Sequence, residues 1–184
     1  HAISAVCGEL YTLYLVSIDG ENILLYSSYN TQLKYPVLLD IEKSVTKVTS
    51  LYGGCVNAAA IDDKGSILFI GSSAEELERK TLEKSILPGS DEKAVCVACC
   101  NDFIFVLSQN GHVFVSPVNS KSLILEFVAV DELNNVDIVQ ISGTFGHCIA
   151  VSREGSVFVR GKNHCGCLGI GKEGDEFDKF TLIS

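Results

Sequence analysis

The 184-residue sequence contains no tryptophan, and it has no long apolar run. A transmembrane helix needs about 20 consecutive apolar residues, and no stretch of the chain approaches that length. Basic residues are scarce, because 14 lysines and arginines stand against 23 aspartates and glutamates. The net charge of -9 would repel a phosphate backbone. These absences argue against a membrane-spanning helix and against direct binding of nucleic acid.

Signals of secretion are also missing. The residues before Gly8 lack the basic flank and cleavage pattern of a signal peptide, and no Asn-x-Ser/Thr acceptor site occurs. Eight cysteines could form four disulfides, but three of them lie in the apolar run Ala94–Cys100, where cysteine behaves as a small buried hydrophobe. We therefore expect reduced thiols and an intracellular protein, either cytoplasmic or nuclear.

Glycines recur in the sequence at intervals of 45, 46 and 44 residues. They are Gly20, Gly65, Gly111 and Gly155. Each follows a polar residue and lies between two strand-like apolar segments, which is typical of a tight hairpin turn. The period predicts one domain, 1–184, with four equivalent hairpins in four repeats. The repeats cover approximately residues 1–44, 45–92, 93–135 and 136–184.

Several of the predicted strands are apolar at consecutive positions, and Phe103–Leu107 is the clearest. A strand in a two-layer sandwich has one wet face and alternates, whereas a strand inside a propeller blade is covered on both faces by neighbouring blades. The sequence therefore predicts an all-β partial β-propeller with about four blades, each a four-stranded antiparallel sheet. Residues 74–84 have weak helical character, and we interpret them as a polar excursion of the second blade, with one or two helical turns as the alternative.

The last repeat carries a fuller motif around its hairpin. Its residues are Gly143, His147, Gly155, Gly161, Asn163, Gly166, Leu168 and Gly169. This pattern resembles the repeat of the regulator of chromosome condensation (RCC1-like) family, most closely over residues 136–184. The copy has Arg160 where the family has tryptophan and Cys167 where it has glutamine. WD and kelch repeats fit less well, because both require tryptophan.

The resemblance implies that the motif residues are structural and that the complete protein is a seven-bladed ring. Seven repeats need roughly 315 residues, whereas four repeats are present here. The remaining blades would come from the same longer chain or from another subunit. Without them, the open blade faces would form a large apolar patch.

Histidines and cysteines gather in the last repeat and suggest zinc. They are His147, Cys148, His164, Cys165 and Cys167. Structural zinc sites use Cys-x2-Cys pairs, whereas these thiols have Cys-x-Cys spacing, so we expect no metal site. No Ser/His/Asp or Cys/His set has a spacing that implies convergence, and we predict no catalytic residues.

Three acidic residues follow the last loop, namely Asp175, Glu176 and Asp178. They lack the spaced oxygen ligands of a calcium loop, and we interpret them as a solvated loop. Their charge also opposes cofactor binding by Gly169–Gly174, which matches Gly-x-Gly-x-x-Gly without a strand-to-helix context. His112 directly follows a turn glycine, and we expect an exposed hairpin residue there, with a place in a binding rim as the alternative.

Repeat regularity without a catalytic set favours a non-catalytic protein–protein interaction module, because propellers present binding loops on a rigid ring. The family resemblance permits an alternative, guanine nucleotide exchange on a Ran-like small GTPase. An exchange factor needs no chemical groups of its own, so the absence of catalytic residues does not separate the two hypotheses. The expected partner is a protein in both cases, and no cofactor is implied.

Overall fold

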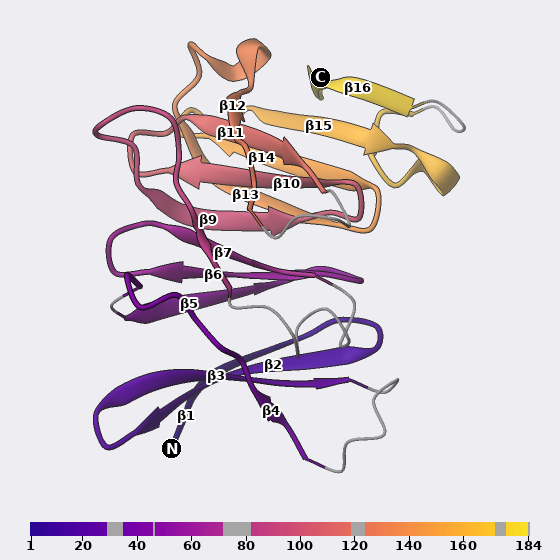
Figure 1. Ribbon diagram of the computed structural model, residues 1–184. Coiled ribbons are helices and arrows are strands. Elements are labelled where there is room, and N and C mark those ends of the chain that lie inside the picture. The colour runs from indigo at the N-terminus through magenta and orange to yellow at the C-terminus, as the bar shows by residue number, and fades with distance from the viewer. Residues whose placement is uncertain (29–34, 46, 72–81, 119–123, 172–175, 184) are drawn as a thin grey trace.

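The computed structural model describes residues 1–28, 35–45, 47–71, 82–118, 124–171 and 176–183. Within these residues the chain forms four four-stranded sheets and two short 3-10 turns, and it contains no α-helix (Figure 1). All strand pairs within the sheets are antiparallel. The described segments include no helix that could cross a bilayer.

Each sheet is a meander of four consecutive strands. The first contains β1 (Ala2–Cys7), β2 (Tyr11–Ile18), β3 (Glu21–Ser28) and β4 (Val37–Leu38). The second contains β5 (Val48–Gly53), β6 (Ala58–Asp62), β7 (Ile67–Ile70) and β8 (Lys84–Ser85). The third contains β9 (Ala94–Cys99), β10 (Phe103–Ser108), β11 (Val113–Pro117) and β12 (Val128–Ala129). The fourth contains β13 (Ile138–Thr144), β14 (His147–Ser152), β15 (Val157–Lys162) and β16 (Glu176–Leu182). The 3-10 turns are η1 (Asp131–Leu133) and η2 (His164–Gly166).

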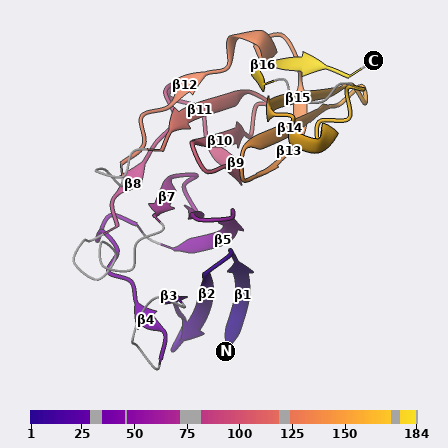
Figure 2. The same ribbon diagram turned by 90° about the vertical axis from the view of Figure 1, so that its right-hand side faces the viewer.

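The four sheets fan out around an arc, as Figure 2 shows. Strands β1, β5, β9 and β13 lie along its inner side, and β4, β8 and β12 lie on its outer side (Figure 2). The inner strands contact one another in series, β1 with β5, β5 with β9 and β9 with β13. The arrangement is four successive blades of a propeller, which confirms the predicted all-β partial-propeller fold. Each sheet lies within one of the four predicted repeats.

Blade three explains why apolar residues run consecutively. Ile104 and Val106 of β10 belong to a core shared with blades one and two, whereas Phe105 and Leu107 belong to a second core shared with blade four. Successive side chains point to opposite faces of a strand, so a strand between two cores needs apolar residues at every position.

The two end blades are covered on one face only, and their strands alternate. In β14, Cys148 and Ala150 are buried, whereas Ile149 is 36% exposed. In β2, Leu13 and Leu15 are fully buried, and Tyr14 between them is half-buried. The outward faces of blades one and four are therefore open in this chain.

The prediction of four equivalent hairpins is wrong for blade one. There Ile18 pairs with Glu21, and both Asp19 and Gly20 have positive φ, at 52° and 89°. Two such residues form the two-residue turn whose twist matches that of the flanking strands. Blades two to four instead share a longer turn, represented by Ile61–Ile67.

The polar segment 74–84 lies outside the described residues as far as residue 81. Leu82 then bridges Ile41 in parallel, and Lys84 pairs with Leu68 at the start of β8. The end of this segment is thus paired as strand, because the outer edge of blade two offers free backbone groups to it.

Candidate functional site

The turn glycines lie at the junction between a hairpin and the following blade. The φ values of Gly65, Gly111 and Gly155 are 80°, 81° and 84°, a region that is costly for residues with a Cβ. A Cβ on Gly65 would lie 2.6 Å from the Cβ of Lys93, whereas open space surrounds Gly155. Gly65 therefore lies against the following blade, and all three glycines serve the conformation of their turns.

The motif residues of the last repeat close the loop after β15. Asn163 is fully buried, and its side-chain Oδ1 accepts a 3.0 Å hydrogen bond from the backbone N–H of Leu168, which is also buried. Gly166 and Gly169 take positive φ values of 70° and 69° within this loop.

Gly161 lies where β15 passes close to the β13–β14 loop. A Cβ on Gly161 would lie 2.1 Å from the carbonyl oxygen of Gly146. Gly143, on β13, faces blade three in the same way, since a Cβ there would lie 2.8 Å from the Cys100 Sγ. Gly161 therefore allows close approach of backbone, and Gly143 allows close approach of a side chain from blade three.

The histidines and cysteines that suggested zinc do not gather into one group. The His147 Nδ1 and the Cys167 Sγ are 4.0 Å apart, but Cys148 is buried and His164 is exposed. The side chain of Cys165 lies outside the described part of the structure. No group of three His, Cys, Asp or Glu side chains suited to a metal occurs among the side chains that are described.

The environments of three cysteines, Cys96, Cys99 and Cys148, oppose nucleophilic chemistry. A hydrogen bond with Cys100 and burial raise the pKa of the Cys148 thiol well above its ordinary value. Burial also raises the pKa of the Cys96 and Cys99 thiols. A thiol attacks as its thiolate, so these cysteines are inert packing groups. The seven described cysteines are all free.

His112 lies on the surface at the β10–β11 turn and forms a side-chain hydrogen bond with Glu92. Its Nδ1 is 2.6 Å from the Oε1 of Glu92, and the two side chains are 50% and 13% exposed. Burial raises the pKa of Glu92, but hydrogen bonds from Ser108, His112 and Asn110 outweigh that effect and leave the pKa below its ordinary value.

The loop Gly169–Gly174 lacks the context of a dinucleotide site. Gly169 and Gly171 follow η2 with positive φ, Gly174 lies outside the described residues, and the next element is strand β16. A strand offers no helix N-terminus to a pyrophosphate.

The interpretation of the acidic residues as a solvated loop is wrong for two of them. Glu176 and Asp178 are exposed, but they begin β16, where Glu176 pairs with Lys162 along the edge of β15. Asp175 lies outside the described residues. The edge pairing carries both carboxylates to the junction between blades three and four, beside residues that sequence reasoning did not select.

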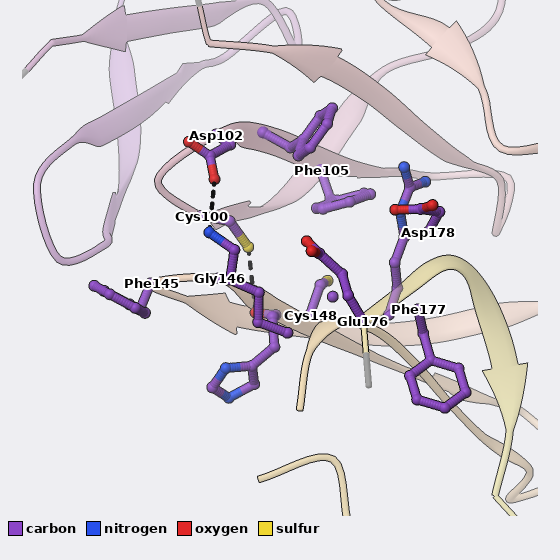
Figure 3. Close-up of a pocket in the computed structure, with 14 residues that line it drawn as sticks. Cys100, Asp102, Phe105, Phe145, Gly146, Cys148, Glu176, Phe177 and Asp178 are labelled. Atoms are coloured by element: carbon purple, nitrogen blue, oxygen red, sulfur yellow. Dashed lines mark hydrogen bonds and ion pairs between the residues drawn. The ribbon is translucent and has the colours of Figure 1, made fainter. Parts of the chain in front are cut away.

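At this junction lies a cavity of about 430 Å³, counted out to its open mouth. The β9–β10 loop, the β13–β14 loop, the end of β15 and the start of β16 line it. In the view of Figure 3, the carboxylate of Glu176 points between Cys100 and Phe105, and Phe145 and Phe177 lie on opposite sides. Among the charged and aromatic lining residues are Asp102, Phe103, Phe105, Phe145, Arg160, Lys162, Glu176, Phe177 and Asp178.

Two cations of the cavity are already engaged. The Arg160 guanidinium lies 5.4 Å from the ring centre of Phe103 and 5.3 Å from that of Phe105, within cation–π range. The Lys162 Nζ lies 3.6 Å from the Asp102 Oδ2. Arg160 occupies the position where the RCC1-like motif has tryptophan, so the sequence did carry a signal here, namely the departure from the motif.

Phe145 projects at the mouth of the cavity in a strained conformation. Its φ is 46°, its side chain is 54% exposed, and its carbonyl oxygen accepts a 2.6 Å hydrogen bond from the backbone N–H of Asn101 in blade three. A bulky residue at positive φ costs about 1–2 kcal/mol. The inter-blade hydrogen bond fixes this conformation and keeps the ring in solvent.

Known proteins similar to this chain share the repeat and the fold. A mouse protein named RCC1-like G exchanging factor-like protein is 30% identical over 208 residues, which cover 95% of this chain and 44% of that protein. Human WBSCR16 matches all of this chain with a TM-score of 0.72 at 20% identity, over 53% of its own chain. Prp20p from Saccharomyces cerevisiae, studied for its binding to Gsp1p and histones, matches all of this chain with a TM-score of 0.72 at 14% identity, over 50% of its own chain.

No model of a protein family matches the chain. The chain spans about half the length of each of these three relatives. The mouse sequence and the two folds agree with the repeat that the residues around Gly155 and Asn163 indicate.

Proposed function

Because the chain is a stretch of RCC1-like β-propeller, we propose that it is a non-catalytic protein–protein interaction module. The observation that carries the proposal is the inter-blade cavity with the exposed ring of Phe145 at its mouth. Propellers build binding surfaces from loops of successive blades, while the strands supply the rigid frame. The buried, protonated thiols support a role without covalent chemistry.

We propose that the partner is an intracellular protein. Direct binding of nucleic acid is not part of the proposal, because a net charge of -9 repels a phosphate backbone. It also includes further blades on the open faces, from the same longer chain or from another subunit. Val139 and Ile149, on blade four, are 44% and 36% exposed, and a neighbouring blade would cover apolar side chains of this kind.

A second candidate function is guanine nucleotide exchange on a Ran-like small GTPase. Two similarities favour it: the name of the mouse relative, and the Gsp1p binding for which Prp20p was studied. Exchange requires a surface that binds the GTPase and loosens its nucleotide, and a rigid loop face is suited to that task without catalytic groups.

One experiment separates the two functions. The full-length protein is mixed with a panel of small GTPases carrying a fluorescent guanine nucleotide, and both binding and nucleotide release are measured. Accelerated release from a Ran-like GTPase supports exchange, and binding without acceleration supports the interaction module.

A matched pair of variants extends the test to partners outside that panel. Quantitative affinity purification compares wild type with Phe145→Asn, which removes the exposed ring, and with Glu154→Gln, in the turn at the other end of strand β14. The interaction module predicts partners lost with Phe145→Asn and kept with Glu154→Gln. An identical set of proteins in all three samples contradicts it.

A further inference from the structure

Two carboxylates of the cavity between blades three and four lack a cationic partner. Neither Glu176 nor Asp178 forms an ion pair within the part of the chain that the structure describes, whereas Asp102 is paired with Lys162. Both are exposed at the start of β16. A carboxylate without a cationic partner beside a concave surface attracts a cation.

The charged residues that line the cavity sum to a single negative charge. The three carboxylates are Asp102, Glu176 and Asp178, and the two cations are Arg160 and Lys162, with histidine counted as neutral. One incoming positive charge would neutralise the group. The chain as a whole carries -9, so the surrounding field also favours a cation.

The aromatic side chains provide the second half of a cation site. Phe145 is 54% exposed and Phe103 is 38% exposed, and Phe177 lines the same cavity. The faces of aromatic rings attract ammonium and guanidinium groups and also pack against the methylene stems of lysine and arginine. The hydrogen bond from Asn101 to the carbonyl oxygen of Phe145 holds the ring in solvent beside the cavity, where a ligand can reach it.

The cavity lies at the junction of two blades, between the β9–β10 loop and the start of β16. Its walls come from two blades, so a segment bound across the junction would contact both.

The geometry points to this cavity as a recognition pocket for a lysine or arginine side chain of a protein partner, held by Glu176 and Asp178 and stacked on Phe145. The inference rests on the proposed interaction function and names the chemistry of the partner. Arg160 stays engaged with Phe103 and Phe105 when the cation enters.

The test uses small probes that carry only the side chain in question. Ligand-observed saturation-transfer NMR on the full-length protein compares the Nα-acetyl methylamides of arginine and lysine with that of citrulline, which has nearly the same shape as arginine but no charge. Arginine and lysine are expected to bind at least about fivefold more tightly than citrulline.

Variants then locate the binding. The double variant Glu176→Gln, Asp178→Asn and the variant Phe145→Asn should each weaken arginine binding by at least about fivefold. Glu154→Gln removes one carboxylate in the turn at the other end of strand β14 and should leave binding unchanged. Asparagine tolerates positive φ, so the thermal unfolding midpoint of Phe145→Asn should not fall, and a binding loss then reflects the missing ring.

Each remaining outcome decides the inference. The inference is wrong if the citrulline probe binds as tightly as the arginine probe, or if the double variant binds the arginine probe as tightly as wild type. It is also wrong if the acetyl methylamide of glutamate binds more tightly, because Arg160 would then be the residue that holds the ligand. If the arginine probe behaves as expected but no protein partner is found, the proposed function fails and the pocket stands. If a partner binds the double variant as well as wild type, the pocket fails alone.

Discussion

The backbone N–H of Ala94 donates a 3.1 Å hydrogen bond to the carbonyl oxygen of Gly65. The same bond recurs one blade later, where Ile138 donates to Gly111 at 3.1 Å. The hairpin turn of one blade thereby holds the first strand of the next. The turn glycine thus serves two needs, positive φ within its own blade and close approach of the following one.

This double role predicts unequal effects of alanine at two turns. Gly20→Ala should cost about 1–2 kcal/mol, because the φ of 89° is costly but nothing lies within 4 Å of the added Cβ. Gly65→Ala should cost about 1–3 kcal/mol more than Gly20→Ala, because its Cβ would lie 2.6 Å from the Cβ of Lys93. Urea unfolding of both variants gives the comparison. Equal losses would show that contact with the next blade adds nothing.

The loop after β15 offers a second prediction about stability. Asn163→Ala removes the acceptor for the Leu168 N–H in a fully buried site and should cost about 1–3 kcal/mol. The neighbouring exposed His164→Ala is the control and should stay within about 0.5 kcal/mol of wild type. Chemical denaturation measures both, and a neutral Asn163→Ala would remove the structural role assigned to this motif residue.

The sequence predicts features that depend on short stretches of chain. Gly65, Gly111 and Gly155 could be found because a tight turn needs positive φ, and consecutive apolar residues of β10 could be found because a middle blade has two buried faces.

Aspartate or serine three residues before these glycines is a local signal that was missed. The Oδ1 of Asp62 accepts hydrogen bonds from Lys64 and Ser66, at 3.0 and 2.7 Å, and this closes the turn.

The cavity could not be predicted in the same way. Its walls come from segments around Asp102, Phe145 and Glu176, which the sequence places far apart and only blade packing brings together. The edge pairing of β16 decides where Glu176 and Asp178 point, and an acidic stretch alone does not reveal that pairing. The conformation of Phe145 likewise depends on a hydrogen bond from another blade.

Stability should depend on pH through Glu92. Its pKa is lower in the folded chain than the ordinary value of 4.5, so its contribution is present above that value and is lost as pH falls through the folded pKa. Glu92→Gln should lose about 0.5–1 kcal/mol at neutral pH, the range of a partly exposed hydrogen bond, because the carboxylate that accepts from His112 is replaced. Urea midpoints of wild type and variant should converge as pH falls below about 4.5. A difference that stays constant down to acid pH would contradict the lowered pKa.

The open face of blade four gives a test of the proposed neighbouring blade. Ile149 is 36% exposed on that face, whereas the adjacent Ala150 is fully buried against blade three. In the 184-residue chain, Ile149→Glu should cost less than about 1 kcal/mol, and Ala150→Glu should prevent folding because it buries an unpaired charge.

The full-length protein should respond differently to the same pair. If a further blade packs on β14, Ile149→Glu places an unpaired charge between two sheets. The substitution should then lower the free energy of unfolding by about 3–5 kcal/mol, the cost of an uncompensated buried charge. Circular dichroism and urea unfolding of both variants in both lengths complete the comparison. A mild Ile149→Glu in the full-length protein would mean that this face stays in solvent, and the ring would then have to be completed from elsewhere.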